Sequence, residues 1–253
     1  MSQKKGANTG KRERYHLPDV IRGITLLSMI AYHGAWDLVY MYGVRWKWYQ
    51  GTGAYIWQQS ICWTFIFLSG FCWPMGKRPL KRGLVVFGSG ILVTVVTLVA
   101  MYQNRVVFGV LTLIGSAMIL MVLLDKLFCR IPPKAGLIVS CACFAITRNI
   151  NRGNLGFESL EFMKLPVEWY RGLFATYLGF TAPDFYSTDY FSLFPWLFLF
   201  TSGYFAYHIF YRKGWLELPF LKWNCPAFSF IGRHSLLIYL LHQPVLYVLC
   251  SLI

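Results

Sequence analysis

The apolar residues of this chain gather into long blocks, separated by short polar and basic stretches. Most blocks run for about 18 to 24 residues, the length a helix needs to cross a hydrocarbon core about 30 Å thick. They lie at about residues 17–41, 55–75, 84–102, 106–124, 136–150, 190–211 and 228–252. The pattern predicts an all-α, polytopic integral membrane protein with about seven transmembrane helices.

The connection between the fifth and sixth blocks is longer than the others and holds an apolar segment of a different kind. Residues 168–181 are apolar but short, and they contain Arg171. They predict a short interfacial or re-entrant helix, with an eighth span as the alternative. We expect residues 1–16 to form a cytoplasmic basic arm and residues 17–253 to form a single transmembrane domain. We expect no cleavable signal peptide, because the first apolar block is long and no small-residue cleavage site follows it.

The composition agrees with this class. Hydrophobic residues make up 57% of the chain, aromatic residues 19% and charged residues only 13%, which leaves too little polar surface for a soluble protein. The seven cysteines lie mostly inside apolar blocks and show no disulfide or metal-ligand spacing. We therefore interpret them as small buried hydrophobes, and we predict no metal site.

The net charge of +14 is distributed unevenly between the two ends of the predicted spans. If the N-terminus is cytoplasmic, the basic arm and most basic connections lie inside, including Lys77, Arg78, Lys81, Arg82, Lys126, Arg130, Lys134, Arg212, Lys213 and Lys222. The positive-inside rule then predicts a multi-pass protein of the cell membrane with its C-terminus outside. Topology and anionic lipid account for the charge, so we predict no nucleic-acid partner.

Ionisable residues inside the first apolar block are candidates for a site, because such groups are costly at membrane depth. Asp19 and Arg22 lie near its inner end, and His33 and Asp37 follow further in, four residues apart on one helix face. A carboxylate one turn from an imidazole can fix its tautomer and raise its basicity, as a general base requires. The alternative is a packing hydrogen bond without chemistry.

The last block carries a second set. Arg233 and His234 lie at its inner end, and His242 lies about 13 Å further along the helix, so His242 could reach the depth of His33. Two imidazoles at one depth indicate a shared cavity. The alternatives are a helix-to-helix hydrogen bond for His242 and simple headgroup anchoring for Arg233 and His234.

Several segments resemble a known family. They are DVIRGITLLSMIAYHGAWDLVYMYG (19–43), FIFLSG (65–70), FGVLTLIGSAMIL (108–120), DYFSLFPWLFLFTSGY (189–204) and IGRHSLLIYLLHQPVL (231–246). In order and spacing they resemble the bacterial members of the heparan-alpha-glucosaminide N-acetyltransferase catalytic-domain family, which is related to the acyltransferase-3 membrane family. The chain departs from the bacterial pattern at Thr112, where relatives carry a histidine. The lysosomal enzyme places its histidine in a different local sequence, so the motif does not transfer that role to His33.

The resemblance implies a transmembrane acyltransferase that moves an acetyl or other acyl group from cytoplasmic acyl-coenzyme A to a sugar or envelope glycan on the outer side. On this basis we expect His33 to act as general base, oriented by Asp37, while His242 stabilises the oxyanion. Arg22, Arg233 and His234 would hold the coenzyme A phosphates. An acceptor platform would be formed by Asp189, Trp196, Trp169 and Arg171.

Two other classes of function stay open. Buried histidine, aspartate and arginine residues also suit a transporter or flippase for a small polar or lipid-linked substrate. Discontinuous helices in matched halves would favour that function, and no such internal symmetry is visible in the sequence. A structural factor of the envelope would explain the helices but not the polar groups at one depth. The acceptor, the acyl chain, an acyl-histidine intermediate and the oligomeric state are left open, with a homodimer as one alternative.

Overall fold

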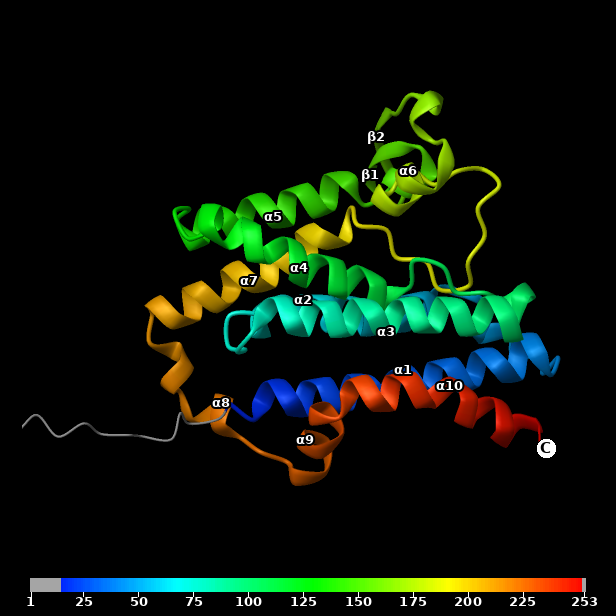
Figure 1. The fold of residues 1–253 in the computed structure, drawn as a ribbon, viewed down its shortest axis with the longest axis horizontal. Coiled ribbons are helices and arrows are strands. Elements are labelled where there is room, and N and C mark those ends of the chain that lie inside the picture. The colour runs from blue at the N-terminus through cyan, green and yellow to red at the C-terminus, as the bar shows by residue number, and fades with distance from the viewer. Residues whose placement is uncertain (1–14, 252–253) are drawn as a thin grey trace, which may run out of the picture.

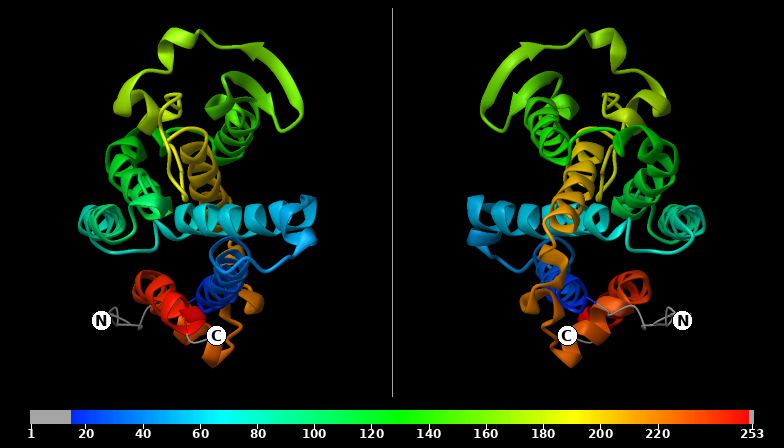
Figure 2. Two further views of the ribbon diagram at one scale, coloured as in Figure 1. Left: turned by 90° about the vertical axis from the view of Figure 1, so that its right-hand side faces the viewer. Right: turned by 90° about the vertical axis from the view of Figure 1, so that its left-hand side faces the viewer.

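The computed structural model describes residues 15–251, most of which are helical. The long helices are α1 (Leu17–Trp36), α2 (Thr52–Cys72), α3 (Pro79–Ala100), α4 (Val110–Phe128), α5 (Pro133–Thr147), α7 (Trp196–Arg212) and α10 (Ser235–Ser251). The short ones are α6 (Gly172–Leu178), α8 (Pro219–Lys222) and α9 (Pro226–Arg233). Figure 2 shows α2 crossing between two groups of helices, with α1 and α10 on one side and α4, α5 and α7 on the other.

The first five predicted blocks correspond to helices with ends shifted by a few residues. The block at residues 17–41 is α1 continued by a π-helical turn, Asp37–Met41. The block at residues 190–211 is helical only from Trp196, because Pro195 disfavours helical conformation in the residue that precedes it. The all-α prediction is therefore confirmed for the long elements.

The last block is not one straight helix, as the sequence predicted. Helices α9 and α10 meet at His234 with a bend of 85°. Helix α9 instead crosses α1 at close range through two glycines. A Cβ at Gly232 would lie 1.8 Å from the Asp19 carbonyl oxygen, and one at Gly23 would lie 2.1 Å from the Phe228 carbonyl oxygen. Close backbone contact at small residues is typical of helix crossings in membranes.

The long connection contains structure that the sequence analysis did not predict. Strands β1 (Asn154–Phe157) and β2 (Leu160–Lys164) form an antiparallel hairpin with a bulge between Leu155 and Gly156. The predicted helix at residues 168–181 is shorter in the structure and consists of the turn Val167–Trp169 followed by α6. We call residues 154–178 the cap, because they extend beyond the end of α5 (Figure 1).

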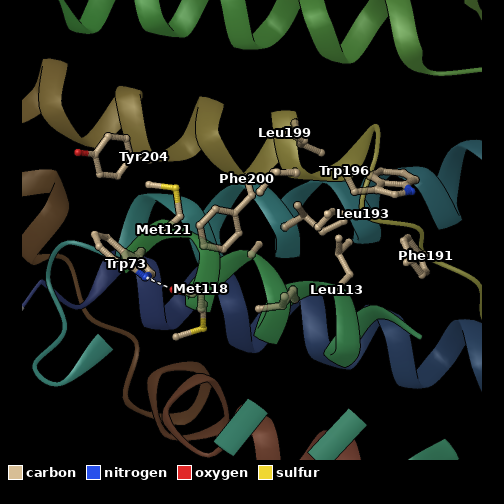
Figure 3. Close-up of a cluster of buried hydrophobic side chains, with 14 of the residues drawn as sticks. Trp73, Leu113, Met118, Met121, Phe191, Leu193, Trp196, Leu199, Phe200 and Tyr204 are labelled. Carbon is tan, nitrogen blue, oxygen red and sulfur yellow. Dashed lines mark hydrogen bonds between the residues drawn. The ribbon is translucent and has the colours of Figure 1, made fainter. Parts of the chain in front are cut away.

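The main core fills the space between α2, α4 and α7 (Figure 3). Its buried side chains include Leu113, Met118, Met121, Phe200 and Tyr204, and the Trp73 indole donates a 3.1 Å hydrogen bond to the Met118 carbonyl. Residues of α2 and α7 approach closely, since a Cβ at Gly70 would lie 1.8 Å from the Phe200 carbonyl oxygen. Glycine therefore sets the spacing of this helix pair as well.

Two of the described helices, α3 and α4, are long and apolar enough to cross a membrane, and the bent pair α9 and α10 makes a third if it is one span. Helices α5 and α7 have 15 and 17 residues, fewer than the roughly 20 usual for a span. Seven spans are therefore not confirmed by length and composition. A membrane environment is nevertheless indicated, because apolar side chains are exposed along α3 and α10: Leu84, Val85, Ile91, Leu92, Val95, Val96, Val99, Leu237, Leu241, Val245, Val248 and Leu249.

Candidate functional site

The structure brings His33 and His242 together. Helices α1 and α10 lie side by side in both figures, and the two imidazole centroids are 5.1 Å apart with their planes inclined by 60°. His242 is only 8% exposed and His33 is partly buried. The sequence predicted that His33 and His242 could lie at one depth, and in the structure the two imidazoles are neighbours although they come from opposite ends of the chain. We call them the histidine pair.

The hydrogen bonding of His242 indicates which ring nitrogen is free. Its Nδ1 contacts the carbonyl oxygen of Tyr239 within its own helix. A carbonyl only accepts, so the neutral ring carries its proton on Nδ1 and a lone pair on Nε2. That Nε2 is buried and has no hydrogen-bond partner among residues 15–251. His242 therefore presents an open acceptor inside the bundle.

Asp37 does not orient His33, contrary to the sequence prediction. Its side chain is fully buried, and the Gln243 amide nitrogen donates to its two carboxylate oxygens at 2.9 and 3.1 Å. Among the described residues no contact joins this carboxylate to His33. The side chains of His33 and Asp37 both face α10. His33 lies against His242, and Asp37 accepts hydrogen bonds from Gln243. The pairing is between helices instead of within one.

Asp189 reaches the same region from the loop before α7. The Val110 backbone N–H donates to its carboxylate at 3.4 Å, and the Tyr239 side chain interacts with it. Asp189 is partly buried, and burial raises the pKa of its carboxyl to about 6. The Tyr239 ring also lies 5.2 Å from the His242 ring, so Tyr239 connects Asp189 to the histidine pair. Tyr239 was not among the residues predicted from the sequence, although its position one turn before His242 could have indicated it.

The other three residues of the predicted acceptor platform do not gather around Asp189. Trp196 is 5% exposed and packs in the core against Phe144 and Phe191. Trp169 and Arg171 are exposed on the cap, which lies on the opposite side of the bundle from α10 (Figure 1). The structure does not bring the four residues of the predicted platform together, because the connection folds back over α5 and only its last part reaches α10.

The residues predicted to hold phosphates lie near the crossing of α1 and α9. Arg22 pairs with Asp19 at 3.4 Å along α1. Arg233 is exposed and donates to the Ser229 carbonyl at 3.1 Å, and His234 is exposed with its ring against Phe230. These three residues therefore lie at one end of the bundle, with Arg233 and His234 exposed and Arg22 mostly buried.

Arg82 belongs to this end but was interpreted from the sequence only as a topology signal. Its guanidinium lies over the backbone of Gly76, where a Cβ would come within 1.3 Å of Nη1. That nitrogen is buried and has no hydrogen-bond partner among the described residues. Electrostatic interactions link Arg82 to Cys72 and Arg22. The run GKRPLKRG thus contains a partly buried arginine, Arg82, whose Nη1 is a hydrogen-bond donor without a partner in the described chain.

A separate polar cluster joins α2, α5 and the cap. The Arg148 guanidinium forms an ion pair with Glu158 at 3.2 Å and donates to the Tyr55 hydroxyl at 3.1 Å and to Gln59 at 2.9 Å. Tyr55 in turn donates to Glu158 at 2.7 Å, and the Arg148 guanidinium lies 5.0 Å from the Trp196 ring centroid. We call this set the arginine cluster. Its charges are paired with one another, as buried charges require.

Comparison of the chain with curated proteins and with solved structures gave no match. A family model described as "Heparan-alpha-glucosaminide N-acetyltransferase, catalytic" matches residues 14–244. This range includes both members of the histidine pair, Asp189 and the basic groups around Arg22 and Arg82. The match confirms the resemblance drawn from the sequence segments. The chain belongs to the family of heparan-alpha-glucosaminide N-acetyltransferase catalytic domains.

Proposed function

We propose that this acetyltransferase takes an acetyl group from acetyl-coenzyme A, or another acyl group from its coenzyme A thioester, on the inner side of the cell membrane. The acceptor is an amine or hydroxyl of a sugar or envelope glycan on the outer side. Family membership supports the acetyltransferase class. The observation that carries the proposal is the histidine pair with the open Nε2 of His242.

The direction of transfer rests on a topology of seven spans with the N-terminus inside. The start of α1, the α2–α3 turn, the α4–α5 turn and the end of α7 lie at the same end of the bundle in Figure 1. Cations are concentrated at these segments: Lys77, Arg78, Lys81, Arg82, Lys126, Arg130, Lys134, Arg212 and Lys213. The positive-inside rule supports this end as the cytoplasmic one.

The chemical step follows from the open nitrogen. His242 Nε2 accepts the proton of the acceptor amine or hydroxyl as its nitrogen or oxygen attacks the thioester carbonyl. The carbon–sulfur bond then breaks, and the leaving thiolate takes the proton back from the imidazolium. His33, 5.1 Å away between centroids, stabilises the developing oxyanion. The roles are exchanged relative to the sequence hypothesis, because within residues 15–251 no carboxylate contacts His33, whereas the Tyr239 carbonyl fixes the His242 ring.

The donor would bind along α1. Coenzyme A carries its phosphates at the far end of a long arm from the thioester. Arg22, Arg82, Arg233 and His234 lie at the inner end of the bundle, and His33 lies about 16 Å further along α1. Guanidinium groups bind phosphate bidentately, so the unpartnered Arg82 donor supports adding this residue to the three predicted from the sequence.

The test measures binding of labelled acetyl-coenzyme A to the purified protein and release of free coenzyme A with a sugar acceptor. We expect Arg233→Ala and Arg82→Gln to weaken binding, and His33→Ala to bind the donor but turn over slowly. Lys213→Gln is the matched control, since Lys213 also lies at the inner end but contacts Trp215.

Saturable binding without any acyl transfer to a panel of amino sugars and glycans would contradict the proposal. Movement of a polar substrate through proteoliposomes without acylation would instead support the transporter alternative.

A further inference from the structure

An apolar groove lies on the side of the bundle away from the histidine pair. It has a volume of about 380 Å³ and is formed by the end of α4, the first half of α5 and α7. Leu124, Phe128, Val139 and Leu197 line it. Its floor is closed where Gly136 meets the Phe205 ring, since a Cβ at Gly136 would lie 2.3 Å from that ring. The volume is within the range of pockets that hold small ligands.

The lining of the groove has few groups that could form hydrogen bonds with water. Thr201 and Ser140 are its hydroxyl-bearing residues, and they are hydrogen-bonded to each other at 3.1 Å. None of the groove residues in the described chain has a buried side-chain nitrogen or oxygen without a hydrogen-bond partner. A buried water usually makes about three hydrogen bonds, and an apolar pocket without such groups holds hydrocarbon more readily. The chemistry of the groove therefore matches an alkyl chain.

The inner end of the groove is strongly positive. Lys126, Arg130 and Lys134 are all exposed around the α4–α5 turn, and Arg130 and Lys134 directly adjoin the lining residues Ile131 and Ala135. The nearby Asp125 carboxylate already accepts a 2.5 Å hydrogen bond from Tyr204. Basic side chains beside an apolar cleft on the cytoplasmic side are a recognised arrangement for anionic lipid headgroups.

We propose that this groove is a binding site for an anionic phospholipid of the inner leaflet. One acyl chain lies between α4, α5 and α7, and the phosphate is held by Arg130 and Lys134. The apolar lining and the adjacent positive charge are separate observations, and a single amphipathic ligand satisfies both. This site is distinct from the proposed donor site, which lies around α1, α3 and α9.

The experiment titrates delipidated protein in detergent with phosphatidylglycerol or with phosphatidylcholine of the same chain length, and native mass spectrometry counts bound lipid. We expect phosphatidylglycerol to bind at least about tenfold more tightly, which corresponds to about 1.4 kcal/mol. Arg130→Gln/Lys134→Gln removes that preference, and Lys77→Gln/Lys81→Gln on the α2–α3 turn is the matched charge control.

A second arm tests the apolar part. Ala135 is exposed and lines the groove, so Ala135→Phe fills it and weakens binding of both lipids, whereas Ile138→Phe on the neighbouring exposed face leaves binding unchanged. Equal affinity for the two lipids, or a preference that survives the double charge substitution, overturns the proposal. So does a protein dimer that Ala135→Phe dissociates, because it would assign the groove to a second copy.

Discussion

The arginine cluster and the histidine pair are both polar groups inside an apolar bundle, and they differ in how completely they are paired. In the arginine cluster, the Arg148 guanidinium donates to Tyr55 and Gln59, and Tyr55 donates to Glu158. The buried Arg148 Nε makes no hydrogen bond within the described residues, but it lies 3.2 Å from the Glu158 carboxylate in an ion pair. In the histidine pair, one nitrogen of His242 is held by a carbonyl and the other has no partner in the described part of the chain. A charge that is paired within the protein stabilises the structure, whereas an acceptor without a partner is available to a substrate.

Burial alone therefore does not identify a site in this fold. Arg148 has a side chain only 13% exposed, and it lies beside the buried Trp196, yet its partners account for its position. Substitutions should therefore separate the two regions. Loss of stability is expected in the arginine cluster and loss of turnover in the histidine pair.

The largest effect is expected for His242→Asn. The asparagine amide can still donate to the Tyr239 carbonyl, so the helix keeps this contact, but it cannot accept a proton as a base. We expect turnover to fall about 10²- to 10⁴-fold, the usual contribution of a general base, with little change in melting temperature. Acetyl transfer and thermal melting of the same preparation measure both. Retained turnover in His242→Asn would assign the base to His33.

Arg148→Met tests the other side of the comparison. It leaves Glu158 without its cation and is expected to destabilise the protein by about 2 to 3 kcal/mol, since hydrogen bonds to charged groups contribute at that level. The double variant Arg148→Met/Glu158→Gln should recover part of this loss. Thermal melting in detergent checks the order of the three proteins. Donor binding below the melting transition should be unchanged, and a loss of binding there would place Arg148 in the site.

Gln243→Leu tests the hydrogen bonds between Gln243 and Asp37, which adjoin the histidine pair. It leaves the fully buried Asp37 carboxylate without its amide donor, at an expected cost of about 1 to 3 kcal/mol in stability. Replacing both groups, in Asp37→Leu/Gln243→Leu, should be less harmful than Gln243→Leu alone. Melting temperatures decide this. If the double variant melts below Gln243→Leu, Asp37 has a role in stability besides its hydrogen bonds with Gln243.

The last prediction is a pH dependence of stability from Asp189. Its carboxyl has a folded pKa of about 6, compared with 3.8 ordinarily, so the folded protein holds this proton where the unfolded chain has released it. Stability should fall as pH rises from about 4 to about 6 and then level off. Asp189→Asn should flatten melting temperature across this window. A wild-type protein without that slope would show that the carboxyl titrates normally.

The sequence predicted the long helices well and the short elements poorly. Apolar blocks located α1 to α5 because hydrophobic length is a local property. The hairpin was missed because β1 buries Asn154 and Gly156, while Leu155 and Phe157 are only partly buried, so its pattern of burial opposes its pattern of hydrophobicity. The 85° bend was missed because apolar residues continue on both sides of His234.

The same distinction holds for the site. His33 and His242 could be predicted because each is an ionisable residue inside an apolar block. Gln243 as the partner of Asp37, and Tyr239 as the neighbour of Asp189, depend on which helices are adjacent, and no local pattern encodes that. The prediction that Asp37 orients His33 failed for the same reason. A spacing of four residues indicates a pair within one helix even when both side chains face another helix.

The strong hydropathy of α3 and α4 has a consequence for how the protein is made. During synthesis α1 and α2 leave the ribosome before α3 and α4, but among the described single helices only α3 and α4 are long and apolar enough to cross a membrane. Helices α3 and α4 are joined by a short connection and pack closely at Gly90 and Gly115. We expect this pair to be the first part of the chain that inserts stably into the membrane. Helix α1, which carries His33, would be firmly inserted only later, and His33 would contact His242 only after α10 has been synthesised. Catalytic competence is thus expected to be a late event of biogenesis.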